Sequence, residues 1–291
     1  MLGIGLFIVL AGGLVALRLQ AFDLPVACFI DSFLPGCLPR AQALADYQAL
    51  AQSLTGLAFP AIAAAPVVIG LLAGISLVGR EIDAGTTVFA WSLGPSRRRW
   101  LWMRLLPTAL TAVCVGLALG LLGNVVLQLS QPGLDPDRSY DLIGNRGLAI
   151  AGETLSAMGL ALLVGAYFGR VLPGLLLAAA AVICASVVIG LASDKALYGE
   201  AMLVGTERGD LGHVVDGFIQ TPTGELLSYA EANNRYPSTD DWLGTNHLRE
   251  LVLINPWATY PVAAARIGLL HLLLGLAAIT ASFAVVERRR P

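Results

Sequence analysis

Six long runs of apolar residues restrict the fold of this chain more than any other feature of its sequence. A helix needs about 20 apolar residues to cross the hydrocarbon core of a bilayer, and each run approaches or exceeds that length. The helices of a soluble bundle would keep a polar face, whereas these runs are apolar all round. The sequence therefore predicts an all-α integral membrane protein with six transmembrane helices and a small mixed external region between the fifth and sixth. The runs are 2–17, 57–79, 105–127, 148–168, 171–192 and 261–286.

The distribution of charge predicts the orientation of these helices, because cytoplasmic loops carry an excess of arginine and lysine. With the amino terminus inside, the cytoplasmic segments hold nine basic and three acidic residues. The longer external segments hold eight basic and sixteen acidic residues. We therefore expect a multi-pass protein of the cytoplasmic (plasma) membrane with both termini cytoplasmic. The cytoplasmic segments are 80–104, 169–171 and 287–291, and the external ones are 18–56, 128–147 and 193–260.

Three parts are expected along the chain. Residues 1–192 carry helices 1 to 5 and the cytoplasmic loop 80–104, residues 193–260 form an external loop domain, and residues 261–291 hold helix 6 and a basic tail. In the external domain, residues 214–219 are typical of a strand, residues 221–224 (Thr-Pro-Thr-Gly) of a turn, and residues 225–227 of a returning strand or the start of a helix.

The first apolar run, 2–17, has a second interpretation as a cleaved signal peptide. Such a peptide normally begins with a positively charged region, and no basic residue precedes Arg18. We expect a retained helix, and the remaining topology is the same in either case.

Two of the four cysteines, Cys28 and Cys37, fall in the first external segment. The Pro35-Gly36 pair between them favours a turn, and an oxidising exterior favours a disulfide. We expect a Cys28–Cys37 bond, with two unpaired thiols as the alternative. Cys114 and Cys184 lie in apolar runs, where cysteine acts as a small apolar residue.

Motifs for catalysis or nucleotide binding are absent from the sequence. A phosphate-binding loop needs Gly-Lys followed by Ser or Thr, and the only lysine, Lys195, stands in Ser-Asp-Lys-Ala. The three histidines, His213, His247 and His271, are too dispersed to predict a metal site by spacing. We therefore expect no cofactor in this chain. The overall charge of −2 reflects the asymmetry across the membrane and gives no indication of nucleic-acid binding.

Two ionisable residues, Glu153 and Arg266, fall inside apolar runs, each about five residues from the external end. Charges within a bilayer tend to pair or to face a cavity, so one interpretation is an intramembrane pair beside a substrate path. The alternative is that Arg266 extends to the headgroups and that Glu153 is interfacial.

The polar segment 80–104 combines acidic and basic residues. Arg97, Arg98 and Arg99 follow Pro95-Ser96 at the expected start of a helix, where the helix dipole disfavours positive charge. Lipid phosphates at the inner leaflet would favour such a cluster. They would repel Glu81 and Asp83, which are either solvated loop residues or acceptors for a basic partner surface.

Residues 80–104 carry a resemblance to a known family. The pattern Arg80-Glu-x-Asp-x-Gly-Thr, then Ala90-Trp91, then Ser96-Arg-Arg-Arg-Trp-Leu resembles the corresponding loop of ABC-2-type exporter permeases, in a form common among actinobacterial members. The paired cysteines, the Asn255-Pro-Trp segment and the basic tail are similar to that group as well.

This resemblance implies a permease subunit with six spans, paired with a second permease chain, identical or homologous, and with two copies of a cytoplasmic ATPase subunit that binds ATP and Mg. Glu81, Asp83, Gly85 and Thr86 would form the contact with that ATPase. Gly85 would allow a turn, and Thr86 could cap the residues after it. The substrate path would be lined largely by the second and fifth helices, and their apolar character suits a lipophilic or amphipathic substrate.

Two other functional classes remain open from the sequence. A membrane sensor or enzyme would act through the 193–260 external domain. A secondary transporter working without ATP would usually show inverted repeats and charged relay residues, which are not evident here.

Overall fold

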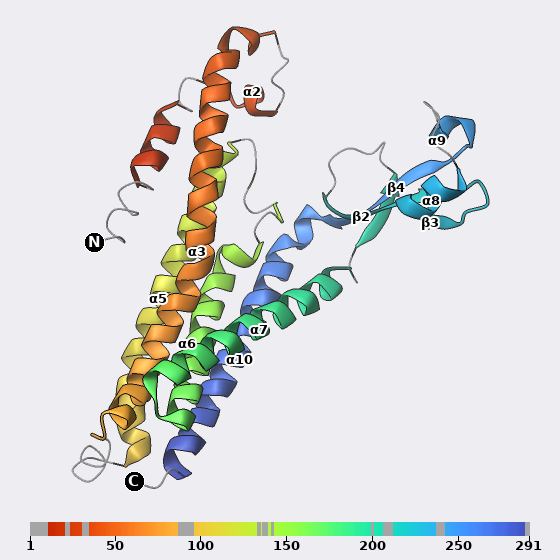
Figure 1. Cartoon of the computed structure of the whole chain (residues 1–291). Helices are drawn as coiled ribbons and strands as arrows, with labels where there is room; N and C mark the ends of the chain where they lie inside the picture. Colours follow the sequence, from red (N-terminus) through yellow and green to blue (C-terminus); the bar gives the residue numbers. More distant parts are fainter. Residues whose placement is uncertain are drawn as a thin grey trace. The chain divides into compact units, whose positions relative to one another are not determined.

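The computed structural model describes residues 11–20, 24–30, 35–86, 96–132, 135, 139–140, 143–198, 201–205, 212–236 and 242–288. The chain divides into two compact units (Figure 1). The helical unit comprises Met1–Pro136, Leu142–Ile189 and Ala264–Pro291, and the small unit comprises Asp137–Asp141 and Gly190–Ala263.

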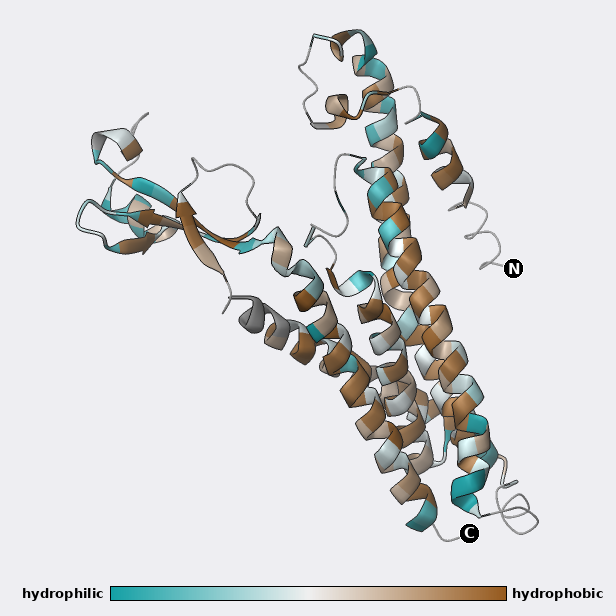
Figure 2. Ribbon diagram, turned by 180° about the vertical axis from the view of Figure 1, so that it is seen from behind, coloured by the Kyte–Doolittle hydropathy of each residue, from teal (hydrophilic) through white to brown (hydrophobic). Residues whose placement is uncertain are grey.

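Five helices of the described chain are long and apolar enough to cross a membrane, and Figure 2 shows apolar residues along their length. They confirm a mainly helical membrane protein. The sixth predicted span, 2–17, is not confirmed: residues 11–20 are helical, and residues 1–10 lie outside the described part. The five helices are α3 (Ala41–Asp83), α5 (Arg97–Ser130), α6 (Leu148–Phe168), α7 (Val171–Tyr198) and α10 (Tyr260–Arg288).

Part of the predicted external segment 18–56 is helical, because α3 begins at Ala41, sixteen residues before the apolar run at 57. Its first turns are amphipathic: Leu44, Tyr47, Ala51 and Leu54 recur at helical spacing and are all buried. They pack with Leu17 and Leu24 in one cluster. Packing of this apolar face therefore stabilises the helix for sixteen residues before the run that is apolar enough to cross a bilayer.

The predicted cytoplasmic segment 80–104 is also partly helical. Helix α3 continues to Asp83 and α5 already begins at Arg97, so both ends of the predicted loop are helical. Helix α7 continues to Tyr198, six residues past the predicted end of its run. Hydropathy detects the apolar part of a helix and misses its polar ends, where the backbone hydrogen bonds continue.

Helix α6 is packed against three other helices of the helical unit. Gly70 of α3, Gly116 of α5 and Gly275 of α10 each place bare backbone against it. A Cβ atom added to any of these three would lie 2.6 to 2.9 Å from an atom of α6, closer than carbon atoms pack. Small residues permit such close approach between membrane helices, and they place α6 at the centre of the bundle.

The expected disulfide joins Cys28 and Cys37, and it ties α2 (Ala27–Ile30) to the 3₁₀ turn η1 (Leu38–Arg40) that leads into α3. The ring of Phe29 lies 4.9 Å from that of Tyr47 in an edge-on contact. The covalent bond therefore closes a segment that is also packed against the first turns of α3.

The small unit is built on a four-stranded antiparallel sheet with the order β1-β4-β2-β3. The strand, turn and returning strand predicted over 214–227 are present as β2, a turn and β3. The strands β1 and β4 were not predicted. The elements are β1 (Met202–Gly205), β2 (Gly212–Gln220), β3 (Leu226–Ser228), α8 (Tyr229–Arg235), α9 (Trp242–Thr245) and β4 (Arg249–Pro256).

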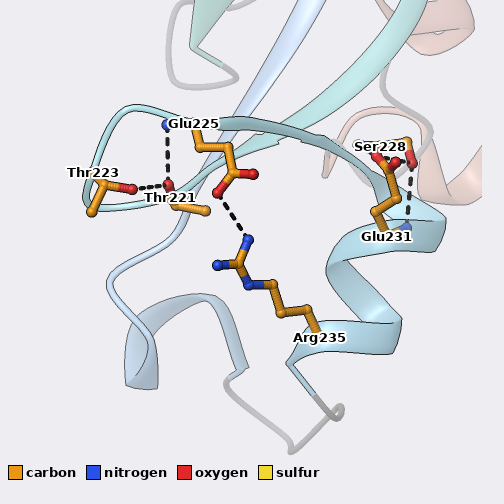
Figure 3. A network of polar contacts seen from close by, with 6 residues as sticks. All are labelled: Thr221, Thr223, Glu225, Ser228, Glu231 and Arg235. Carbon is orange, nitrogen blue, oxygen red and sulfur yellow. Dashed lines mark hydrogen bonds and ion pairs between the residues drawn. The ribbon is translucent and has the colours of Figure 1, made fainter.

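Polar contacts order the turn after β2 and the start of α8 (Figure 3). Ser228 accepts from the backbone N–H of Glu231, and the carboxylate of Glu231 accepts from the backbone N–H of Ser228, which is a capping box. The hydrogen bonds that the Glu231 carboxylate accepts from the backbone N–H and the hydroxyl of Ser228 lower its pKa. Arg235, in the last turn of α8, donates to Glu225 over 2.8 Å. Together these contacts connect α8 to β3 and to the preceding turn.

Candidate functional site

The ends of several helices gather at one end of the helical unit, and we call this region the polar end. It contains the last turn of α3, the first turns of α5, the junction between α6 and α7, and the last turn of α10 (Figure 1). Hydrophilic residues mark the end of α3 and the beginning of α5 (Figure 2). The predicted coupling residues and the predicted basic cluster therefore lie in one region.

Glu81, in the last turn of α3, forms an ion pair with Arg104 of α5. The guanidinium of Arg104 also lies 4.7 Å from the ring centre of Trp100, a cation–π geometry. The side chain of Glu81 is 20% exposed, against 44% for Arg104. The second carboxylate oxygen of Glu81 is buried and has no hydrogen-bond partner among the described residues. Glu81 thus joins α3 to α5 within this chain.

Helix α3 ends at Asp83 and is followed by a Schellman motif in which Gly85 is the left-handed residue. The N–H of Gly85 donates to Ile82 O over 3.1 Å, and the N–H of Thr86 donates to Glu81 O over 3.1 Å. Gly85 has a φ of 70°, which glycine adopts without a steric penalty. The hydroxyl of Thr86 donates back to Glu81 O, whereas the residues it was predicted to cap lie outside the described part.

Asp83 connects α3 to the start of α7. Its Oδ2 atom accepts the backbone N–H of Val171 over 3.4 Å. That N–H belongs to the first turn of α7, where it has no partner within the helix and where a negative charge is favourable. Asp83 is also exposed, as are Gly85 and Thr86, so this tip of α3 is accessible to a partner.

The three arginines at the start of α5 differ in their surroundings. Arg97 is partly buried and donates to the backbone oxygen of Glu287 in α10 over 3.5 Å. Arg98 and Arg99 are exposed. The predicted basic cluster therefore contains one residue that connects two helices and two that remain accessible to lipid phosphates.

A row of polar side chains crosses the helical unit from α7 through α6 to α10. Ser186 donates to the carboxylate of Glu153 over 3.3 Å. One turn further along α6, the hydroxyl of Ser156 lies 3.3 Å from Nδ1 of His271, which is buried. Glu153 therefore connects α6 to α7 through Ser186, and Arg266 lies exposed on α10.

Arg104, Val171 and Ser186 were not singled out from the sequence, although each holds a predicted site residue in place. Their partners are 23, 88 and 33 residues away along the chain. Arg104 carried a detectable signal, since it is the one base in the first turns of α5 that lies outside the arginine triplet. Val171 takes part through its backbone N–H, so its side-chain type gave no indication of the contact.

Residues 4–193 match the family described as ABC-2 membrane transporter related. Because the match covers more than half of the chain, the protein belongs to that family. No curated protein and no solved structure matches the chain. Membership indicates a membrane-embedded transport subunit of the ABC type, and the matched range includes the contacts of Glu81 and Asp83 at the polar end.

Proposed function

We propose that the chain is the permease subunit of an ATP-driven ABC exporter that moves a lipophilic or amphipathic substrate across the cytoplasmic membrane. ATP and Mg would be bound by a separate ATPase subunit, present in two copies, and a second permease chain, identical or homologous, would complete the transporter. The observation that carries this proposal is the polar end, where four helix ends are connected by Glu81, Asp83 and Arg97 in a chain of this family.

In this proposal the exposed tip Asp83–Thr86 meets the ATPase, and Glu81 transmits the movement. A displacement of the tip would reach α5 through the ion pair with Arg104 and α7 through the contact of Asp83 with Val171. Both routes lead into membrane helices. In this assignment Asp83, Gly85 and Thr86 bind the partner and Glu81 connects α3 to α5, while Asp83 also contacts the start of α7.

The coupling role is tested by introducing positive charge at the tip. Asp83→Lys and Thr86→Lys are expected to reduce the ATPase recovered with the chain at least tenfold, because an unpaired charge at an interface costs about 2–5 kcal/mol. The matched control is Asp216→Lys, which reverses an exposed charge in the small unit. Recovery of ATPase and substrate-stimulated ATP hydrolysis are the two readouts. Full activity in both tip variants would refute the coupling role.

The proposed orientation is tested separately, with both termini and the polar end on the cytoplasmic side. A cysteine replacing Asp216 should react with a membrane-impermeant thiol reagent in intact cells, and one replacing Arg98 should react only after the cells are opened. Labelling of position 98 in intact cells would show the opposite orientation and refute the proposed topology.

A further inference from the structure

An apolar pocket of about 340 Å³ opens between α5, α6 and α10. Its floor consists of small residues from α6 and α10, and leucines stand around it. Two of those leucines, Leu148 and Leu269, are 62% and 53% exposed. In a membrane protein such a surface faces hydrocarbon rather than water. The lining includes Ala151, Gly152 and Gly268 in the floor and Leu148, Leu269 and Leu117 around it.

The pocket lies near one boundary of the membrane. Helix α6 has 21 residues and is therefore about 31 Å long at 1.5 Å per residue, close to the roughly 30 Å thickness of the hydrocarbon core. Its first turn, at Leu148 and Ala151, contributes to the pocket. On α10 the lining continues inward to Leu272, so the pocket runs from the level of the glycerol groups into the region of the acyl chains.

A cationic side chain stands beside this pocket. Arg266 directly follows Ala265, which lines it, and precedes Leu269 by one turn on the same face of α10. Arg266 is exposed, and its long side chain can reach towards the headgroups. Arginine binds phosphate through parallel hydrogen bonds, so hydrocarbon and phosphate recognition adjoin at this position.

We propose that the pocket binds one acyl chain of an anionic phospholipid whose phosphate contacts Arg266. The size of the pocket favours a lipid over a helix of a second protein copy. On α10 it extends only from Ala265 to Leu272, about 10 Å along the axis, whereas paired membrane helices need small residues along a longer face. The proposal requires that the chain spans a membrane and does not depend on transport.

The test uses the full chain, with any proteins that co-purify, in nanodiscs of phosphatidylcholine. A minor fraction of the lipid carries a photoreactive diazirine on one acyl chain, either as phosphatidylglycerol or as phosphatidylcholine. Mass spectrometry locates the labelled peptides. Labelling at the starts of α6 and α10 should exceed labelling of the exposed face of α7, and phosphatidylglycerol should be preferred about fivefold, because each basic residue near the surface contributes about 1 kcal/mol.

Three variants separate the two parts of the site. Ala265→Phe fills the pocket and should reduce its labelling by both lipids to the level of α7. Ala180→Phe, on the exposed face of α7, is the matched control and should change nothing at the pocket. Arg266→Gln should abolish the preference for phosphatidylglycerol while acyl labelling persists.

Labelling of the pocket no stronger than that of α7 would overturn the proposal, as would unchanged labelling in Ala265→Phe. A cross-link from position 265 to a second copy of the chain would replace the lipid with a protein partner and overturn it as well. If Ala265→Phe does not fold, Arg266→Gln decides: a retained preference for phosphatidylglycerol refutes the headgroup contact.

Discussion

The Glu81–Arg104 ion pair is asymmetric, and the asymmetry predicts which partner matters more for stability. Arg104→Gln removes the cation that pairs with a carboxylate that is 20% exposed and whose second oxygen is already buried. Leaving such a group unsatisfied costs about 1–3 kcal/mol. Glu81→Gln instead leaves Arg104, which is 44% exposed and still in contact with Trp100. An exposed ion pair contributes only about 0–1 kcal/mol.

We therefore expect Arg104→Gln to lower the free energy of unfolding by at least about 1 kcal/mol more than Glu81→Gln does. The double variant should resemble Glu81→Gln, because no charge then remains buried without a partner. Reversible unfolding in mixed micelles, followed by tryptophan fluorescence, measures these differences. Arg98→Gln, which removes an exposed arginine of the same helix, is the control and should have little effect. A larger loss for Glu81→Gln, or additive losses in the double variant, would refute the reasoning.

Three further outcomes are expected. Gly74→Ala should destabilise the helical unit by about 1–3 kcal/mol through overpacking, because the added Cβ would lie 2.8 Å from the Cβ of Ala161. The control is Gly56→Ala, which has open space around it and should be neutral or stabilising in the same unfolding assay. Reduction of the disulfide should increase proteolysis around Cys28 without loss of α3 helicity. The pKa of Glu231 is lowered, so the ionised carboxylate stabilises α8 fully at pH values above the ordinary carboxyl pKa. This stabilisation is lost as the pH falls through the lowered pKa, and hydrogen exchange of the α8 amides should accelerate over that acidic range.

The membrane helices were predictable in their apolar centres and much less so at their ends. A window of apolar residues detects what lipid requires, and α6 was predicted to the residue for that reason. The first sixteen residues of α3 are stabilised by packing on one face instead. Their spacing, at Leu44, Tyr47, Ala51 and Leu54, was present in the sequence as an amphipathic pattern and indicated a helix where a loop was predicted.

The strands of the small unit also differ in how far local sequence predicts them. Strand β2 and the turn after it have local signals, a β-branched run and a Pro-Thr-Gly sequence. Strand β1 is only four residues long, and it becomes a strand by pairing with β4, where Gly205 lies opposite Leu251, 46 positions further along the chain. Its register, Met202 opposite Ile254, depends on that distant partner. Propensity alone does not contain such information.

The polar end shows how residue type and contact differ in predictability. Acidic residues at the end of one helix and basic residues at the start of the next predicted a charged surface, and charged side chains do gather at the polar end. Which base meets Glu81 could not be inferred, because Arg97 through Arg99 and Arg104 are all near in sequence. The position of each arginine around the axis of α5 determines its partner: Arg104 lies one turn beyond Trp100 and faces α3, whereas Arg97 faces α10.

Glycine spacing was the strongest unused signal for how the helices pack. Gly70 and Gly74 on α3 repeat at an interval of four, as do Gly116 and Gly120 on α5. In a bilayer, helices gain little from hiding apolar surface from lipid, so close backbone contact through small residues directs their association. Helix α6 and helix α10 each carry two glycines seven residues apart, at 152 and 159 and at 268 and 275, so two turns of the helices can meet in register. These matched intervals point to α6 as the common neighbour, and the close contact of α6 with α10 at Gly152 and Gly268 forms part of the lining of the pocket that we assign to a lipid.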